Sequence, residues 1–247
     1  MTCGQKWDWL LKALTAGGTV GAVVFALFQD AYRRLLRHPV LKLAANIAPP
    51  DCVKITSLVT NSTTGAIIGE ADTYYLRIRV ENAGIVAARN VEVYARSLRT
   101  YRNGAWTEVR QFPPMNLTWS NLRTMYLPIL APDQTFRHCD VAHIVEPARR
   151  HVFQGAEDAP QQLRGLDPNS VLLSFDLIQR PNHRGHIVGP GIYQLEIEVG
   201  AENAKPVRTA LEIFVHGDWD GNEGEMLGRL VKICEGQNCS LDWPERQ

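Results

Sequence analysis

The sequence lacks the features that mark most enzymes, nucleic-acid-binding proteins and disulfide-rich secreted domains. Among its 247 residues, 26 Lys plus Arg balance 26 Asp plus Glu, so no basic field favours a nucleic acid as partner. Its five cysteines lack the even, patterned spacing of a disulfide framework, which predicts free thiols in a reducing compartment. The motifs of phosphate-binding loops, nucleophile elbows and zinc proteases do not occur. We therefore expect a protein that is not an enzyme and that uses no metal or cofactor.

Long apolar runs are also scarce, and the one that exists lies near the N-terminus. Residues 13–28 carry no charge, and residues 9–11 extend the run to about 20 residues, interrupted only by Lys12. A helix of this length crosses a hydrocarbon core ~30 Å thick. The segment 29–34 that follows is not the small-residue cleavage site of a signal peptide. We expect a transmembrane helix over residues 9–28, with a buried core helix or a cleaved signal peptide as alternatives.

Positive charge beside this run predicts its orientation. Lys6 and Lys12 precede it or lie near its start, whereas Arg33, Arg34, Arg37 and Lys42 follow it, with the three arginines inside five residues. Because cytoplasmic flanks are enriched in Lys and Arg, the C-terminal domain is expected on the cytoplasmic side of an inner (plasma) membrane. The three arginines are also candidates for contact with anionic membrane lipid. The alternative is that they only fix the topology.

Small residues recur every four positions within the apolar run. Ala13, Gly17 and Gly21 would share one face of the expected helix. Small residues on one face let two helix backbones approach closely, as in transmembrane dimers with a GxxxG pattern. This face is the candidate surface for a homo-oligomer.

After Pro50 the hydrophobic pattern changes from the helical period to alternation. Four stretches share a strict alternation of apolar and polar residues: 74–80, 91–95, 193–199 and 207–215. This pattern is typical of strands with one buried face. The more continuously apolar stretch 171–178 predicts a central strand, and Asn103-Gly104 predicts a tight hairpin turn. Many strands without helices between them favour a β-sandwich over residues 51–215.

One motif resembles a known family. The segment 80–84 (VENAG), followed by Ala88, Asn90 and Val91, resembles the turn of bacterial immunoglobulin-like modules of the CARDB type, and residues 189–199 resemble their penultimate strand. In that family a strand ends at the Asn, the Gly makes the turn and the next strand begins at the Asn-Val pair. The resemblance, which covers mainly residues 74–95 and 189–199, implies an immunoglobulin-like fold and an adhesive or spacer role without catalytic residues. Such modules usually lie outside the cytoplasm, in conflict with the orientation inferred above.

The other segments complete the expected organisation. Residues 1–8 form a short tail, 29–50 a basic juxtamembrane helix and linker, and 216–247 an acidic loop, a short helix over 223–233 and a tail. The acidic residues of 218–223 are expected to favour the positive N-terminal end of that helix. A calcium loop is the alternative, but its Gly would come too early for the usual spacing.

Two polar clusters are the remaining candidates for chemistry. In the first, His138, Cys139, Asp140 and His143 would divide on a regular strand, with Cys139 and His143 on one face. We expect Cys139 to be an ordinary core residue rather than a ligand or nucleophile. The second cluster, residues 183–186 (HRGH), is expected to be a solvated loop, with contact to an anion as the alternative.

These observations favour a non-enzymatic, single-pass membrane-anchored binding protein. It would present a β-sandwich domain to an unknown protein or small-molecule ligand, with membrane lipid and a second copy of itself as further partners. One alternative is a membrane effector that oligomerises through its transmembrane helix in a bacterial defence or signalling system. Another is an extracytoplasmic immunoglobulin-like adhesion or spacer module.

Overall fold

A computed structural model describes residues 14–15, 17–26, 28–29, 38–61, 63–122, 124–152, 167 and 169–235. The chain divides into two units, Met1–His38 and Pro39–Gln247. In the first unit the described residues between 14 and 29 are helical. Within the described part of the chain, no helix combines the length and apolar character that a membrane span requires. Much of the expected 9–28 segment, Ala13 included, lies outside the described residues, so the span stays a prediction.

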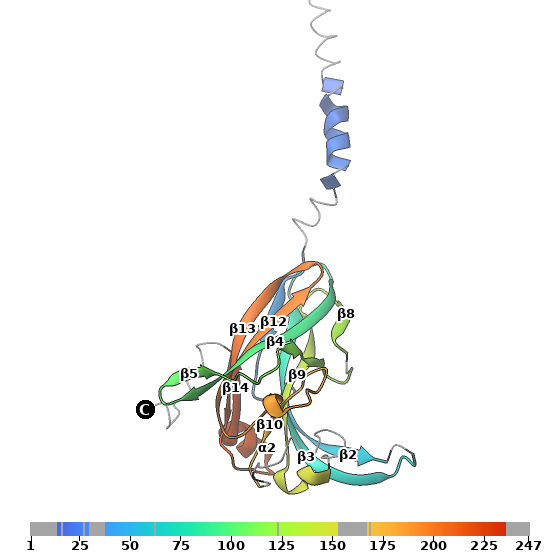
Figure 1. The fold of residues 1–247 in the computed structure, drawn as a ribbon. Coiled ribbons are helices and arrows are strands. Elements are labelled where there is room, and N and C mark those ends of the chain that lie inside the picture. The colour runs from blue at the N-terminus through green and yellow to red at the C-terminus, as the bar shows by residue number, and fades with distance from the viewer. Residues whose placement is uncertain are drawn as a thin grey trace, which may run out of the picture. The chain divides into compact units, whose positions relative to one another are not determined.

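The second unit is built from two antiparallel sheets that pack as a sandwich (Figure 1). Sheet A has the strand order β1-β3-β9-β10-β11, with β2 paired to β3 and β7 paired to β9. Its strands are β1 (Leu41–Ala44), β2 (Cys52–Thr60), β3 (Ile67–Asn82), β7 (Thr118–Trp119), β9 (Thr135–Val145), β10 (Leu173–Phe175) and β11 (Ile187–Val188).

Sheet B has the order β14-β13-β12-β4-β5, with β6 and β8 paired to β4. Its strands are β4 (Ala88–Arg102), β5 (Ala105–Glu108), β6 (Met115–Asn116), β8 (Tyr126–Leu130), β12 (Gly191–Ala201), β13 (Ala204–Val215) and β14 (Val231–Glu235). The helical segments of this unit are η1 (Pro147–Val152), η2 (Arg184–His186), α2 (Glu223–Glu225) and η3 (Met226–Leu230). The prediction of a mainly β, sandwich-like domain is confirmed.

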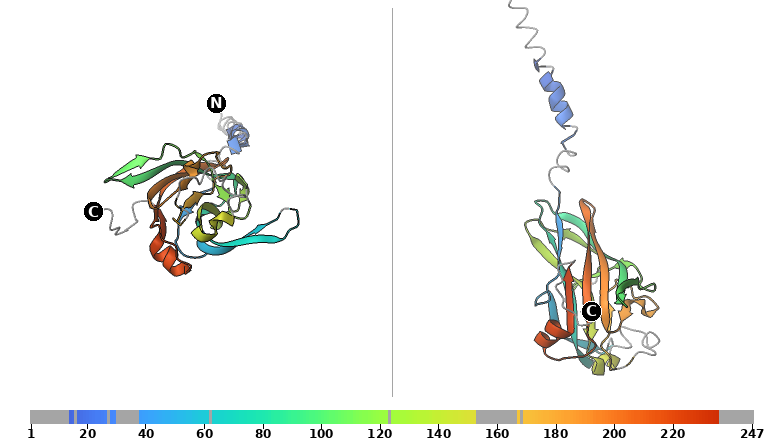
Figure 2. Two further views of the ribbon diagram at one scale, coloured as in Figure 1. Left: turned by 60° about the horizontal axis from the view of Figure 1, so that its bottom comes forward. Right: turned by 90° about the vertical axis from the view of Figure 1, so that its left-hand side faces the viewer.

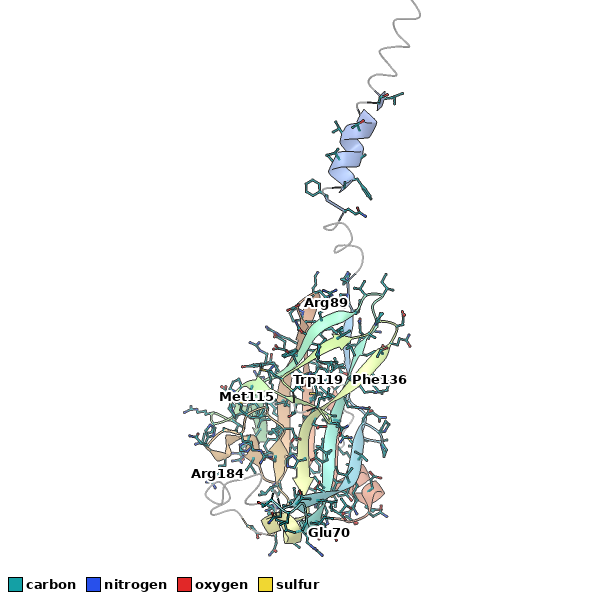
Figure 3. The ribbon with its side chains drawn as sticks, turned by 90° about the vertical axis from the view of Figure 1, so that its right-hand side faces the viewer. Glu70, Arg89, Met115, Trp119, Phe136 and Arg184 are labelled. Atoms are coloured by element: carbon teal, nitrogen blue, oxygen red, sulfur yellow. The ribbon has the colours of Figure 1, made fainter. Side chains whose placement is uncertain are left out.

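The core between the sheets contains the apolar faces that alternation predicted. Tyr74, Leu76, Ile78 and Val80 of β3 are buried, and the apolar faces of β4 and β12 are buried opposite them. Trp119 is fully buried among the strands in the middle of the domain, as Figure 3 shows. Each such side chain contributes about 1.5–3 kcal/mol through removal from water.

Two local turns show why their sequences were informative. Asn103 and Gly104 have φ of 52° and 77°, and Arg102 pairs with Ala105 across the β4–β5 hairpin. This confirms the predicted tight turn, which requires left-handed backbone at both positions. β3 ends at Asn82, as expected from the motif, but neither Asn82 nor Gly84 adopts a positive φ. The buried Asn82 amide instead fixes the turn through hydrogen bonds, and β4 begins at Ala88, ahead of the expected start.

Two expected elements are present but shorter than expected. The stretch 171–178 contains only the three-residue strand β10, because Leu177 and Ile178 leave the ladder and bond to the segment around β6 and β7. The helix expected over 223–233 ends at Leu230, and Ile233 pairs with Ile213 in sheet B. Val231 and Ile233 alternate with polar residues and are β-branched, so this segment forms a strand that pairs with β13.

The cysteines agree only partly with the expectation of free thiols. Cys52 and Cys139 are free and buried in the core. Burial raises the pKa of Cys52 to about 11 and raises the pKa of Cys139 as well, so both thiols stay protonated. Cys234, in contrast, is in a disulfide bond.

Candidate binding groove

A β-bulge in β9 determines which side chains reach the outer face of sheet A. Leu76 of β3 pairs with Ala142, but the next residue, Arg77, pairs with Asp140, so Val141 is an extra residue in β9. A bulge of this kind reverses the alternation beyond it. His143 therefore shares the outer face with Asp140, and the expected grouping of Cys139 with His143 is wrong.

The outer face of sheet A carries a groove of about 870 Å³. Its polar residues come mainly from strands β3, β9 and β10 and from the segment after β10, and they include two arginines as well as two aspartates: Tyr75, Arg77, Asp140, His143, Ser174, Asp176 and Arg180, with Thr60, Thr118 and Asn121 beside them. Its apolar wall comes from β2 and from the turn after β7: Ile55, Leu58, Val59 and Leu122. Cross-strand pairing aligns Tyr75, His143 and Ser174 in one row across the sheet.

Asp140 is held from two sides at the floor of the groove. Its Oδ1 accepts hydrogen bonds from Arg77 Nε at 2.8 Å and from Ser120 Oγ at 2.5 Å. The Arg77 guanidinium also lies over the Tyr75 ring, 5.2 Å from its centroid. Burial raises the pKa of Asp140, and the negative charge of Asp176 raises it further, against the lowering effects of Ser120 and Arg77.

A second carboxylate, Asp176, lies beside this pair. Its Oδ1 is 2.9 Å from His143 Nδ1, and the His143 and Tyr75 rings are 5.6 Å apart. Asp176 Oδ2 is buried and has no hydrogen-bond partner among the described residues. The Asp176 side chain as a whole is 16% exposed and lines the groove, whereas this oxygen is enclosed by the protein.

His138 belongs to a different cluster, outside the groove. Its Nε2 lies 2.9 Å from Asp51 Oδ1, and Asp51 Oδ2 lies 3.1 Å from Arg79 Nε. Asp51 is almost completely buried and directly precedes β2. The cluster therefore fastens the end of the 38–51 segment to β3 and β9. In the described residues no group of three or more His, Cys, Asp or Glu side chains is arranged to hold a metal ion.

The acidic segment 218–223 caps a helix and contacts β2, in agreement with the capping expectation. Asn222 Oδ1 accepts from Glu225 N at 3.2 Å, and Asp220 Oδ1 accepts from Asn222 N at 2.8 Å. Glu223 Oε1 accepts from the backbone N–H of Lys54 at 2.6 Å. These bonds direct the oxygens towards N–H donors rather than towards a common centre.

The segment 183–186 is solvated in only one half: His183 and Arg184 are exposed, as the sequence suggested for the whole loop. Gly185 and His186 are buried in η2. A Cβ atom at Gly185 would overlap the Gln111 carbonyl, so the close approach of two backbones requires glycine there. Although the sequence of this segment is polar, its second half is therefore a tightly packed turn.

The membrane-related candidates are less fully described. Gly17 and Gly21 are helical, and no atom lies within 4 Å of the position that a Cβ would take at either one. Ala13, Arg33, Arg34 and Arg37 lie outside the described residues. The self-association face and the lipid contact therefore stay predictions.

Comparison of the chain with protein-family models, with curated proteins and with solved structures found no match. The CARDB-type resemblance thus rests on the quoted residues alone. The groove has to be interpreted from its own chemistry.

Proposed function

We propose that this chain is a membrane-anchored, non-enzymatic binding protein that holds its ligand in the groove on sheet A. The observation that carries the proposal is that two neighbouring carboxylates, Asp140 and Asp176, line a groove of about 870 Å³. That volume lies within the ~300–1,000 Å³ of typical small-ligand sites.

The groove chemistry favours a ligand with a cationic N–H group beside an aliphatic part. Asp140 and Asp176 are close enough for the charge of one to raise the pKa of the other. A ligand ammonium or guanidinium group between them would relieve that repulsion. The exposed side chains of Leu58 and Leu122 would contact the aliphatic part. A small amine and the side chain of a peptide supply the same chemistry.

The local hydrogen bonds favour binding over catalysis. A serine nucleophile needs a neighbouring base that removes its proton in the reaction. Ser120 instead donates to Asp140, which also holds Arg77.

A thermal-shift measurement on the full-length chain in mild detergent tests the groove. We expect n-butylammonium and n-butylguanidinium to raise the unfolding midpoint, and neutral 1-butanol to leave it unchanged. Asp176→Asn should abolish the shift, because it removes the charge that attracts the cation. Asp218→Asn, at an exposed acid outside the groove, is the matched control. Equal shifts in both variants, or no shift by either cation, would overturn the proposal.

The anchor is proposed from the sequence pattern. Residues 9–28 would form the span, and the arginines at 33, 34 and 37 would keep the sandwich in the cytoplasm and lie near anionic lipid. The immunoglobulin-like character of the sandwich rests on the CARDB-type motif around Asn82. Self-association would use the face of Ala13, Gly17 and Gly21.

One observation favours a second candidate, an extracytoplasmic adhesion or spacer module. Cys234 is in a disulfide bond, and disulfides persist mainly in oxidising compartments. The CARDB-type resemblance points to the same side of the membrane. A topology experiment, argued below, separates the two candidates.

A further inference from the structure

Strand β2 offers the longest open edge of the two sheets. It spans nine residues, Cys52–Thr60, and within the described part of the chain it pairs with β3 alone. The other strands at sheet edges, such as β1, β5 and β14, have four or five residues. An open edge presents a row of unpaired N–H and C=O groups to any strand of matching shape.

The edge is covered at its start, where the Lys54 N–H donates to Glu223 Oε1 at 2.6 Å, but from Ile55 onward it lacks the devices that usually protect such strands. Residues 55–60 (ITSLVT) include no charge, proline or glycine. In contrast, β1 carries Lys42, and β14 carries Lys232 and Glu235. Lys54, the single charged residue of β2, is turned to its own domain: its Nζ lies 2.7 Å from Asp72 and 2.9 Å from the Gly221 carbonyl.

The outer parts of β2 and β3 form an arm that projects from the body of the sandwich (Figures 1 and 2). Leu58, Ile67 and Ile68 are more than half exposed on this arm. A two-stranded ribbon is only marginally stable in water without a third strand or a covering layer. The arm therefore has the structure of an element that another strand completes.

We infer that β2 pairs antiparallel with β2 of a second copy, so that the two copies of sheet A form one continuous sheet. The strand is complementary to itself when the two-fold axis passes through Ser57. Ile55 of each copy then lies opposite Val59 of the other, and pairs of β-branched residues stabilise adjacent strands. The ladder would consist of the Thr56–Leu58 pairs on either side of this axis, because the Lys54 N–H beyond them is already bound to Glu223.

The pairing would also relate the two grooves. A two-fold axis perpendicular to the sheet leaves the faces unchanged, so both grooves would open on the same side. β2 supplies Ile55, Leu58 and Val59 to the apolar wall of its groove. The second copy would therefore adjoin that wall. The inference depends on the edge alone and would survive a failure of the proposed ligand.

Cross-linking of the full-length chain in membranes tests the pairing. In a Ser57→Cys variant the two new thiols would lie directly opposite each other, with Cβ atoms about 4.5–5.5 Å apart. Mild oxidation should give a covalent dimer on a non-reducing gel, above the background of the parent chain. Ile85→Cys, at an exposed loop position that is 65% accessible, is the matched control and should give only that background. Equal yields from the two variants would overturn the inference.

Discussion

His143 and Asp176 meet on the outer face of sheet A, with Nδ1 and Oδ1 2.9 Å apart. They do so because the extra residue Val141 in β9 turns His143 away from the core. The same bulge leaves Asp140 next to Arg77, so two polar pairs lie side by side in one groove. Removal of one residue from the ladder would direct His143 into the apolar core.

Asp140 should make the stability of the domain depend on pH. Burial raises its pKa in the folded state, so the folded protein binds this proton more tightly than the unfolded chain does. Its protonation therefore stabilises the fold at low pH, and this contribution is lost as the pH rises from about 4 through the folded-state pKa. In Asp140→Asn, the free energy of unfolding should depend less on pH across this window. Urea titrations at a series of pH values measure the slope.

The control for Asp140 is Asp218→Asn, because Asp218 is largely exposed and lies outside the groove. Its slope should match that of the parent chain. An unchanged slope in Asp140→Asn would contradict the assignment of the raised pKa to this carboxyl.

Asn82 should be far more important for stability than an exposed asparagine. Its buried amide accepts from Val40 N and Gly84 N and donates to the carbonyls of Val86 and Leu130. Asn82→Ala leaves these buried groups unsatisfied, so the free energy of unfolding should fall by about 3 kcal/mol. Urea denaturation monitored by tryptophan fluorescence measures the change.

Asn203→Ala provides the comparison for Asn82. Asn203 is exposed, and it bonds to Arg89 N and to the Ala87 carbonyl, both of which water can reach in its absence. The loss should stay below about 1 kcal/mol. Equal losses in the two variants would mean that burial does not set the cost at Asn82.

The fold was predictable where the burial of one face of a strand requires apolar and polar residues to alternate in the sequence. The alternation at 74–80 and 193–199 predicted buried faces, and Asn103-Gly104 predicted its hairpin, because both signals are local. The ends of elements were less predictable. Ile233 fits a helix face and a strand equally well, and only the open edge of β13 decides between them.

The groove was not predictable for two physical reasons. A bulge changes which side chains share a face without changing composition, so the alternation around His143 predicted the wrong partner. The second reason is distance along the chain, because His143 and Asp176 are 33 residues apart and come together only in the folded sheet. The only sequence signal for the groove was the polar face of the strands, which includes Tyr75 and Arg77.

Self-association of the N-terminal helix should depend on its small residues. Gly17→Leu together with Gly21→Leu places bulky side chains where two backbones would approach, so the dissociation constant should rise roughly tenfold. Thr19→Leu, on a different face of the helix, should leave it unchanged. Energy transfer between labelled copies of the full-length chain in detergent micelles measures the constant. Equal effects of the two changes would contradict the assigned face.

The orientation of the chain should depend on the three arginines that follow the apolar run. Because positively charged flanks are retained in the cytoplasm, the sandwich should be protected from protease added to intact spheroplasts and digested in inverted vesicles. Replacement of Arg33, Arg34 and Arg37 by Glu should make a fraction of the chains accessible from outside. Immunoblotting of a C-terminal epitope measures that fraction.

The same three substitutions within the sandwich, at Arg89, Arg110 and Arg229, should not change the accessible fraction, because distant charges do not set topology. The oxidation state of Cys234 is a second test of the side of the membrane on which the sandwich lies. In a reducing cytoplasm its disulfide should be accessible to reduction, and alkylation of freshly lysed cells should find a free thiol. A parent chain that is digested from outside and whose Cys234 resists alkylation would instead support the extracytoplasmic module, since digestion requires exposure outside the cell and a persistent disulfide requires an oxidising environment.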